Sequence, residues 1–152
     1  MGRLVKLTVS EMAIADYVGK GREADYKNNK LRMCKKNGEY LNIIGARAEM
    51  AVCKLFNAWP DLNFGVDDYD CIIKDKKVDV KATDIKHGSM TATLNKKKSS
   101  TEVYILAYVE DNLIDILGYV TAEDLINEDS IGDLGYGPIY LVRQTDSKFK
   151  KM

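Results

Sequence analysis

The stretch of sequence that decides the fold is Asp70-Cys71-Ile72-Ile73-Lys74-Asp75-Lys76-Lys77-Val78-Asp79-Val80-Lys81-Ala82-Thr83. Its two ends are apolar or alternating and its centre is a polar turn signal, which predicts two strands joined as an antiparallel hairpin. Side chains alternate between the faces of a strand, so Asp79 and Lys81 share one face while the valines share the other. The turn returns Asp70 to the same end of the sheet. The segment therefore predicts two carboxylates and an ammonium group close together.

This combination of side chains suits phosphodiester hydrolysis. A hard divalent cation held by oxygen ligands polarises the phosphate and lowers the pKa of bound water. Asp70 and Asp79 suit the metal, and Lys81 suits charge stabilisation or the handling of the attacking water. Asp67 and Asp68 lie close enough in the sequence to take the place of Asp70, so the first metal ligand stays open among these three residues.

The sequence before the hairpin has the pattern of helices. Ser10, followed by acidic and apolar residues, predicts a helix start, and we expect Gly19 and Gly21 to interrupt this helix before a second, polar helical stretch over residues 22–34. Apolar residues recur at helical spacing over residues 41–58, which predicts an amphipathic helix ended by the proline at position 60.

The sequence after the helices has the pattern of strands. Beyond the hairpin, the predicted strands are residues 103–109, 113–120 and 139–143, with a short helix at 121–125. We therefore predict a mixed α/β (α+β) fold in which N-terminal helices precede a central mixed β-sheet flanked by helices. The chain fits one domain over residues 1–152, with an N-terminal helical segment at 1–40 and a catalytic core at 41–145.

The spacing of a carboxylate, eight residues and Asp-x-Lys resembles the motif of the PD-(D/E)XK nuclease superfamily. Residues 45–51, Gly-Ala-Arg-Ala-Glu-Met-Ala, resemble the helix motif with which that family supplies a glutamate, here Glu49. The strands at 103–109 and 117–120 resemble its late core strands, so the likeness covers roughly residues 43–125.

The resemblance implies a restriction-endonuclease-like core and an endonuclease that acts on DNA, structure-selective as in the Holliday-junction-resolving branch and working as a homodimer. It implies Mg²⁺, with Mn²⁺ as a substitute. The implied ligands are Glu49, Asp70, Asp79 and the backbone carbonyl of Val80. RNA stays open as a second substrate.

Charge is balanced overall and uneven locally. The chain has 23 basic and 23 acidic residues, but lysines gather between residues 74 and 98 and acidic residues between 110 and 133. A second basic stretch runs through residues 27–36. Lysines after the hairpin are placed to neutralise phosphates, and the predicted DNA contacts are Lys86, Lys96, Lys97 and Lys98.

Other classes of protein fit the sequence less well. No apolar run reaches the roughly 20 residues of a membrane-spanning helix and no signal peptide is recognisable, so we expect no membrane partner and a cytoplasmic protein, compatible with a bacterial or phage genome-processing role. Cys34, Cys53 and Cys71 form no C-x-x-C pair, which disfavours a disulfide framework or a zinc site. Two alternatives remain: a non-catalytic DNA-binding module that depends on a partner, and a binding protein that uses the acidic segment 110–133.

Overall fold

The structure is a computed structural model that describes residues 2–27, 38–65 and 68–152. Cys34, Asp67 and most of the basic stretch at 27–36 lie outside the described residues. The elements in chain order are β1 (Arg3–Lys6), α1 (Val9–Lys27), α2 (Gly38–Phe56), β2 (Cys71–Ile73), β3 (Lys76–Thr83), β4 (Met90–Ala92), β5 (Val103–Glu110), β6 (Leu113–Thr121), α3 (Ala122–Leu125), β7 (Ile131–Asp133), β8 (Pro138–Val142) and β9 (Lys150–Lys151), with 3₁₀ turns at Lys98–Ser100 and Glu128–Ser130.

The first helix differs from the sequence prediction in two ways. Its cap is Thr8 and not Ser10: the Thr8 N–H donates to the Glu11 carboxylate at 2.7 Å, and the Glu11 N–H donates to the Thr8 hydroxyl at 3.2 Å. The prediction that Gly19 and Gly21 interrupt the helix is also wrong, because α1 runs through both glycines. Their small size serves packing, since α1 lies against the backbone of α2 at Gly19 and against the Phe64 ring at Gly21.

We expect Gly19→Ala to lower the free energy of unfolding by about 1–3 kcal/mol. A Cβ at this position would lie 2.7 Å from the Cα of Ile43, and a helix backbone cannot move aside as a side chain can. The control is Gly45→Ala in α2, where a Cβ meets nothing within 4 Å and the alanine should be neutral or stabilising. Urea unfolding of both variants is the measurement. Equal effects at the two positions would contradict this packing role.

The main sheet has the strand order β1-β6-β5-β3-β2, and β9 also pairs with β6. The hairpin β2/β3 is antiparallel, as predicted, and the hairpin β5/β6 is antiparallel too, whereas β3 and β5 pair in parallel. A second sheet has the order β4-β8-β7. The predicted mixed α/β class is confirmed at this level, while β1, β4, β7 and β9 were not predicted.

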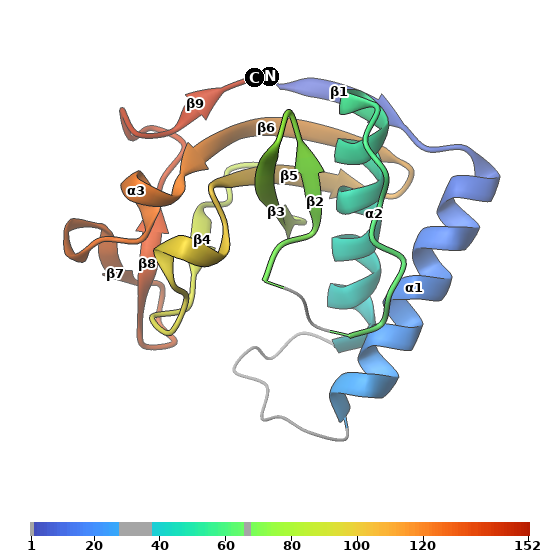
Figure 1. The fold of residues 1–152 in the computed structure, drawn as a ribbon, viewed down its shortest axis with the longest axis horizontal. Helices are drawn as coiled ribbons and strands as arrows, with labels where there is room; N and C mark the ends of the chain where they lie inside the picture. The colour runs from blue at the N-terminus through green and yellow to red at the C-terminus, as the bar shows by residue number, and fades with distance from the viewer. Residues whose placement is uncertain (1, 28–37, 66–67) are drawn as a thin grey trace.

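Different elements pack on the two faces of the main sheet, as Figure 1 shows. On one face α2 packs on β3, β5 and β6, with α1 outside it. The residues of this core include Ala48, Val52, Val78, Val80, Ile105, Ala107, Ile114 and Ile116. On the other face lie α3 and the second sheet, with a core that includes Met90, Tyr104, Leu106, Val120, Leu125 and Val142. The two faces of β5 therefore look into two separate cores.

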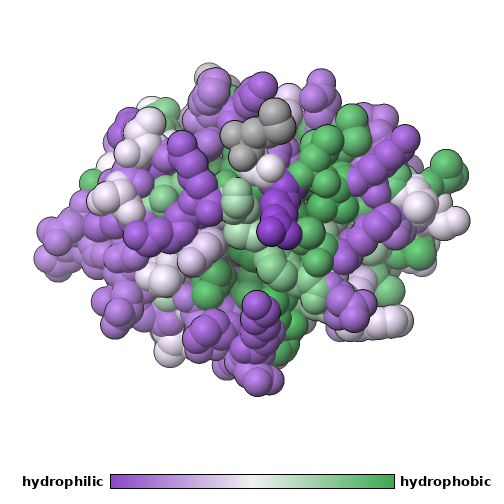
Figure 2. Space-filling view, turned by 90° about the horizontal axis from the view of Figure 1, so that it is seen from above, coloured by the Kyte–Doolittle hydropathy of each residue, from purple (hydrophilic) through white to green (hydrophobic). Residues whose placement is uncertain are grey.

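The surface is mixed in polarity. Seen from the end where both termini lie, hydrophilic residues cover most of the left side, and hydrophobic residues gather right of the centre, on the side of α1 and α2 (Figure 2). Within the described residues, no helix has the length and apolar character needed to cross a membrane.

Candidate active site

The site forms where β2 stops covering the edge of β3. In the β2/β3 register Cys71 is paired with Val78, and no β2 strand pairing continues beside the rest of β3. Beyond Val78 this edge of β3 is open, because β2 no longer pairs with it. Side chains from the two faces of the sheet, and from α2, can therefore approach one another around the edge of β3. The length of β2 is therefore what makes room for a site.

Asp70 lies at this open edge and bonds to β3 through two hydrogen bonds. Its backbone N–H donates to the Val78 carbonyl at 2.8 Å, and its carboxylate accepts from the Val80 N–H at 2.6 Å. The carboxylate thus replaces the missing strand as an acceptor for β3. Of the alternative ligands, Asp68 has an exposed side chain, and its backbone carbonyl accepts from Lys96 and Thr101. Asp67 is not among the described residues.

Asp79 lies on the face of β3 opposite α2 and is buried. Two ammonium groups contact its carboxylate: Lys81 Nζ lies 3.0 Å from one oxygen, and Lys96 Nζ lies 3.0 Å from the other. The predicted neighbours Asp79 and Lys81 are therefore brought together. Lys96, predicted only as a DNA contact, reaches back over seventeen residues of sequence into the same cluster.

Glu49 comes from α2 and is buried as well. A single guanidinium nitrogen of Arg22, in α1, donates to both Glu49 oxygens at 2.8 and 2.9 Å. The same guanidinium donates to the backbone carbonyls of Asp61 and Asn63 at 3.1 Å. Arg22 thus ties Glu49 to the loop after α2, and removing it would leave a buried carboxylate without its cation.

The charges of Glu49, Asp70 and Asp79 act on one another. Burial raises the pKa of Glu49 to about 7, against the opposing pull of Arg22, with Asp79 adding to the rise. Burial first, and then the charges of Glu49 and Asp79, raise the pKa of Asp70 well above its usual range, while the Val80 N–H and Lys81 lower it. An added cation would stabilise the charged forms of Glu49 and Asp70, whose pKa values are raised.

No protein-family model matches this sequence, and no curated protein is similar to it.

The donor chemistry of the cluster fits a hard divalent cation, because its side chains are carboxylates. The hydroxyl of Tyr104, the β5 residue paired with Asp79, is buried there without a hydrogen-bond partner among the residues that the structure describes, and burial raises its pKa to about 12. Across residues 2–27, 38–65 and 68–152, however, no three acidic, Cys or His side chains are arranged to hold a metal. Lys81, Lys96 and Arg22 take the cationic positions beside Asp79 and Glu49.

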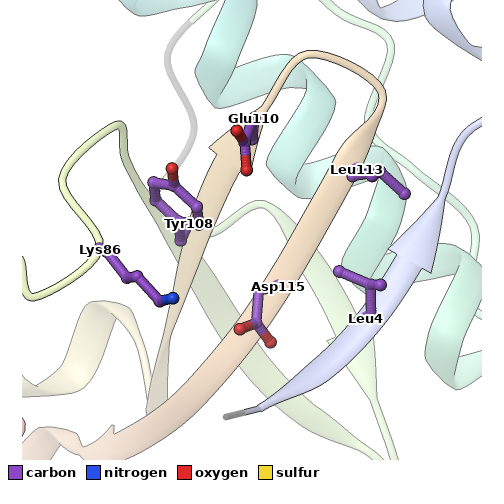
Figure 3. Close-up of a pocket in the computed structure, with 6 residues that line it drawn as sticks. All are labelled: Leu4, Lys86, Tyr108, Glu110, Leu113 and Asp115. Atoms are coloured by element: carbon purple, nitrogen blue, oxygen red, sulfur yellow. The ribbon is translucent and has the colours of Figure 1, made fainter.

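The other predicted DNA contacts lie in different places. Lys97 lines the groove next to Lys96, and the exposed Lys98 begins the 3₁₀ turn that follows. Lys86 is on the loop after β3 and lines a separate groove of about 380 Å³ with Leu4, Tyr108, Glu110, Leu113 and Asp115. Figure 3 shows its amine pointing into that groove, between the loop and the strands. The structure therefore groups Lys96 and Lys97 and leaves Lys86 apart.

We expect the free energy of unfolding to fall as the pH rises through the range in which Glu49 titrates. The unfolded carboxyl group loses its proton near pH 4.5, whereas the folded one keeps it until about 7. The folded state therefore binds more protons between these values, and stability should decrease by at most about 3 kcal/mol from this residue. Urea unfolding in chelator at about pH 5 and about pH 8 measures the change.

The matched variant for this pH dependence is Glu49→Gln, which keeps the shape of the side chain and removes its titration. Its stability should fall less between the two pH values than that of the parent chain. Asp70 contributes in the same direction in both proteins, and less in the variant, because the Glu49 charge no longer raises the pKa of Asp70. An identical pH dependence in the two proteins would contradict a raised pKa at Glu49.

Proposed function

We propose that this chain is a divalent-metal-dependent nuclease that hydrolyses phosphodiester bonds in DNA. The observation that carries the proposal is that Lys81 contacts Asp79 at 3.0 Å and that the charges of Glu49, Asp79 and Lys81 all act on Asp70 at the open edge of β3. A hairpin that presents Asp-x-Lys, beside a helix that supplies a buried glutamate, also supports a restriction-endonuclease-like core. The proposal places the protein in the cytoplasm, with DNA as its partner.

Each residue of the cluster has a role that follows from its charge. Asp70, Asp79 and Glu49 would hold the cation, with the Val80 carbonyl beside them. When bound, Mg²⁺ supplies electrophilic activation of the phosphate and a water of lowered pKa. Lys81 can place its ammonium against the charge that develops on the phosphate oxygens. In the hydrolysis, the water oxygen bonds to phosphorus, the bond to the leaving strand breaks, and the leaving oxygen takes up a proton.

Lys96 adds a second ammonium group to the cluster, on the same carboxylate that Lys81 contacts. Its ammonium lies on the Asp79 oxygen that faces away from Lys81 and also donates to the Asp68 carbonyl at 2.9 Å. A phosphate that enters the site offers Lys96 a second anion, so we expect this side chain to pass from Asp79 to the substrate as the cation binds.

A second candidate function is a non-catalytic DNA-binding module of the same fold. The observation that favours it is that Lys81 and Lys96 already neutralise Asp79 and that Arg22 neutralises Glu49. In such a module the charges would stabilise the fold, and phosphodiester chemistry would come from a partner. The two candidates differ in whether the purified chain cuts DNA by itself.

Cleavage of a nucleic-acid panel separates these candidates. The purified chain is incubated with linear duplex, supercoiled, single-stranded and branched DNA and with RNA, in Mg²⁺, in Mn²⁺ and in chelator. We expect cutting of DNA in either metal and none in chelator. Salt-dependent binding without cutting in any metal would favour the non-catalytic module, and the absence of both would overturn the proposal.

A further inference from the structure

Two grooves flank the acidic cluster and share Tyr69. One, of about 440 Å³, lies between the loop that follows α2 and the start of β2, and Trp59, Leu62, Asp70 and Ile72 line it with Tyr69. The other, of about 520 Å³, lies beyond Tyr69 and is lined by residues that include Lys77, Lys96, Lys97 and Ser99. Asp70 therefore has an aromatic groove next to it, and Tyr69 joins that groove to a basic one.

The first groove exposes apolar surface that has no role in the fold. The side chain of Trp59 is 83% exposed, and Ile72 on β2 is 46% exposed. A tryptophan is costly to leave in water, because it is among the side chains that gain most from burial. Large exposed apolar groups gathered in a groove mark a surface that binds something. The groove at Trp59 is therefore suited to a ligand that offers a flat apolar face.

The second groove is basic, whereas the first is apolar and aromatic. Lys77 lies over the Tyr69 ring, with its Nζ 5.5 Å from the ring centroid, and Lys96 reaches from this groove to Asp79. Lys97 is exposed beside them. Several ammonium groups along one groove suit a chain of phosphates. The ligand that combines flat apolar faces with regularly spaced phosphates is a nucleic-acid strand.

We propose that the groove at Trp59 binds an unpaired nucleotide of the substrate, with its base stacked on the indole and its neighbouring phosphates in the basic groove. Bases within a continuous duplex are already stacked on one another, so only an unpaired base can offer its face to Trp59. The substrate class is then single-stranded DNA or the unpaired arm of a branched structure. This inference rests on the proposed function, because it places that strand across the same carboxylates.

Trp59 is the only tryptophan of the chain, so its fluorescence reports on this groove alone. The experiment uses chelator, so that binding is measured without cutting. An oligothymidylate of about 15 nucleotides should quench the emission by about half. An abasic strand of equal length carries the same phosphates, and it should bind while leaving the emission nearly unchanged.

Variants test whether stacking contributes to affinity. Trp59→Ala should weaken binding of the oligothymidylate about tenfold and leave binding of the abasic strand unchanged. The high exposure of Trp59 means that its removal should not affect folding. The matched control is Tyr136→Ala, which removes another exposed aromatic side chain (57%) from the turn between β7 and β8, and it should change neither affinity.

Two results would overturn the inference. One is an unchanged emission on oligothymidylate binding together with an unchanged affinity of Trp59→Ala. The other is self-association, measured by sedimentation velocity, that Trp59→Ala abolishes while nucleotide affinity stays the same, because the groove would then be a contact between copies of this chain. If the oligothymidylate quenches the emission but the chain cuts no DNA, the proposed nuclease activity is wrong and the proposed nucleotide-binding groove stands. If the chain cuts DNA but the oligothymidylate leaves the emission unchanged, the nuclease activity stands and the nucleotide-binding groove is wrong.

Discussion

Replacing Asp79 with asparagine should reduce DNA cleavage on the order of a thousandfold. The substitution keeps the size of the side chain and removes the charge that both Lys81 and Lys96 contact at 3.0 Å. The proposed cation would lose a ligand, so the affinity for Mn²⁺ should fall together with the rate. Single-turnover cleavage of the substrate identified by the nucleic-acid panel measures the rate, and calorimetric titration measures the metal affinity.

The control for this variant is Asp75→Asn in the same hairpin. Asp75 is exposed in the turn at the far end of the hairpin and has a φ of 65°, a conformation that asparagine tolerates well. It should leave both rate and metal affinity unchanged. If Asp79→Asn folds, as judged by circular dichroism, and still cuts at the parental rate, then Asp79 has no part in catalysis.

The second large effect is expected for Lys81→Met. Methionine keeps most of the length of the side chain without its charge, so cleavage should slow by about a hundredfold or more while Mn²⁺ affinity stays within about twofold. This split between rate and metal binding is what separates the role of Lys81 from that of Asp79. Lys150→Met, on the exposed strand β9, provides a matched loss of one surface charge and should have no effect.

Lys81 could instead act only as a structural partner of Asp79. In that case Lys81→Met would lower the stability and the metal affinity together, and the rate at saturating metal would recover. Urea unfolding of the variant, measured alongside its cleavage rate at increasing Mn²⁺, distinguishes these results. Full recovery of the rate would contradict a role in stabilising charge on the phosphate.

The parts of the fold that the sequence predicted are those with strong local signals. The hairpin at residues 70–83 combines alternation with a polar turn, and α2 has a long apolar stripe, so both were found with small errors in their ends. The missed strands β1, β4, β7 and β9 are two to four residues long. Such segments are too short to show a period, and pairing with distant strands is what makes them strands.

The two glycines of α1 show how packing can reverse a local rule. Glycine weakens a helix, which made an interruption at Gly19 the natural expectation. The structure has α1 against α2 at this position, where any larger residue would meet the Ile43 backbone. The residue that Gly19 packs against, Ile43, lies 24 residues further along the chain. No local sequence pattern could therefore have predicted this contact.

The same distinction applies to the candidate site. The spacing along one hairpin was enough to place Asp79 beside Lys81, and the helix motif singled out Glu49. Arg22 was missed, because its partner is 27 residues away on another helix. Tyr104 was missed as well, because nothing in its strand indicates that its hydroxyl is buried near Asp79 and, among the described residues, has no hydrogen-bond partner. Only the parallel pairing of β3 with β5 brings Tyr104 next to Asp79.

The central claim is that the carboxylates of Asp70 and Asp79 hold a divalent cation at the open edge of β3. The most direct test is anomalous diffraction from crystals of the chain soaked in Mn²⁺. We predict a peak within coordination distance of both carboxylates, with Lys96 withdrawn from Asp79, and no such peak in crystals of Asp79→Asn. A Mn²⁺ peak elsewhere in the molecule, with Lys96 still bound to Asp79, would contradict the claim.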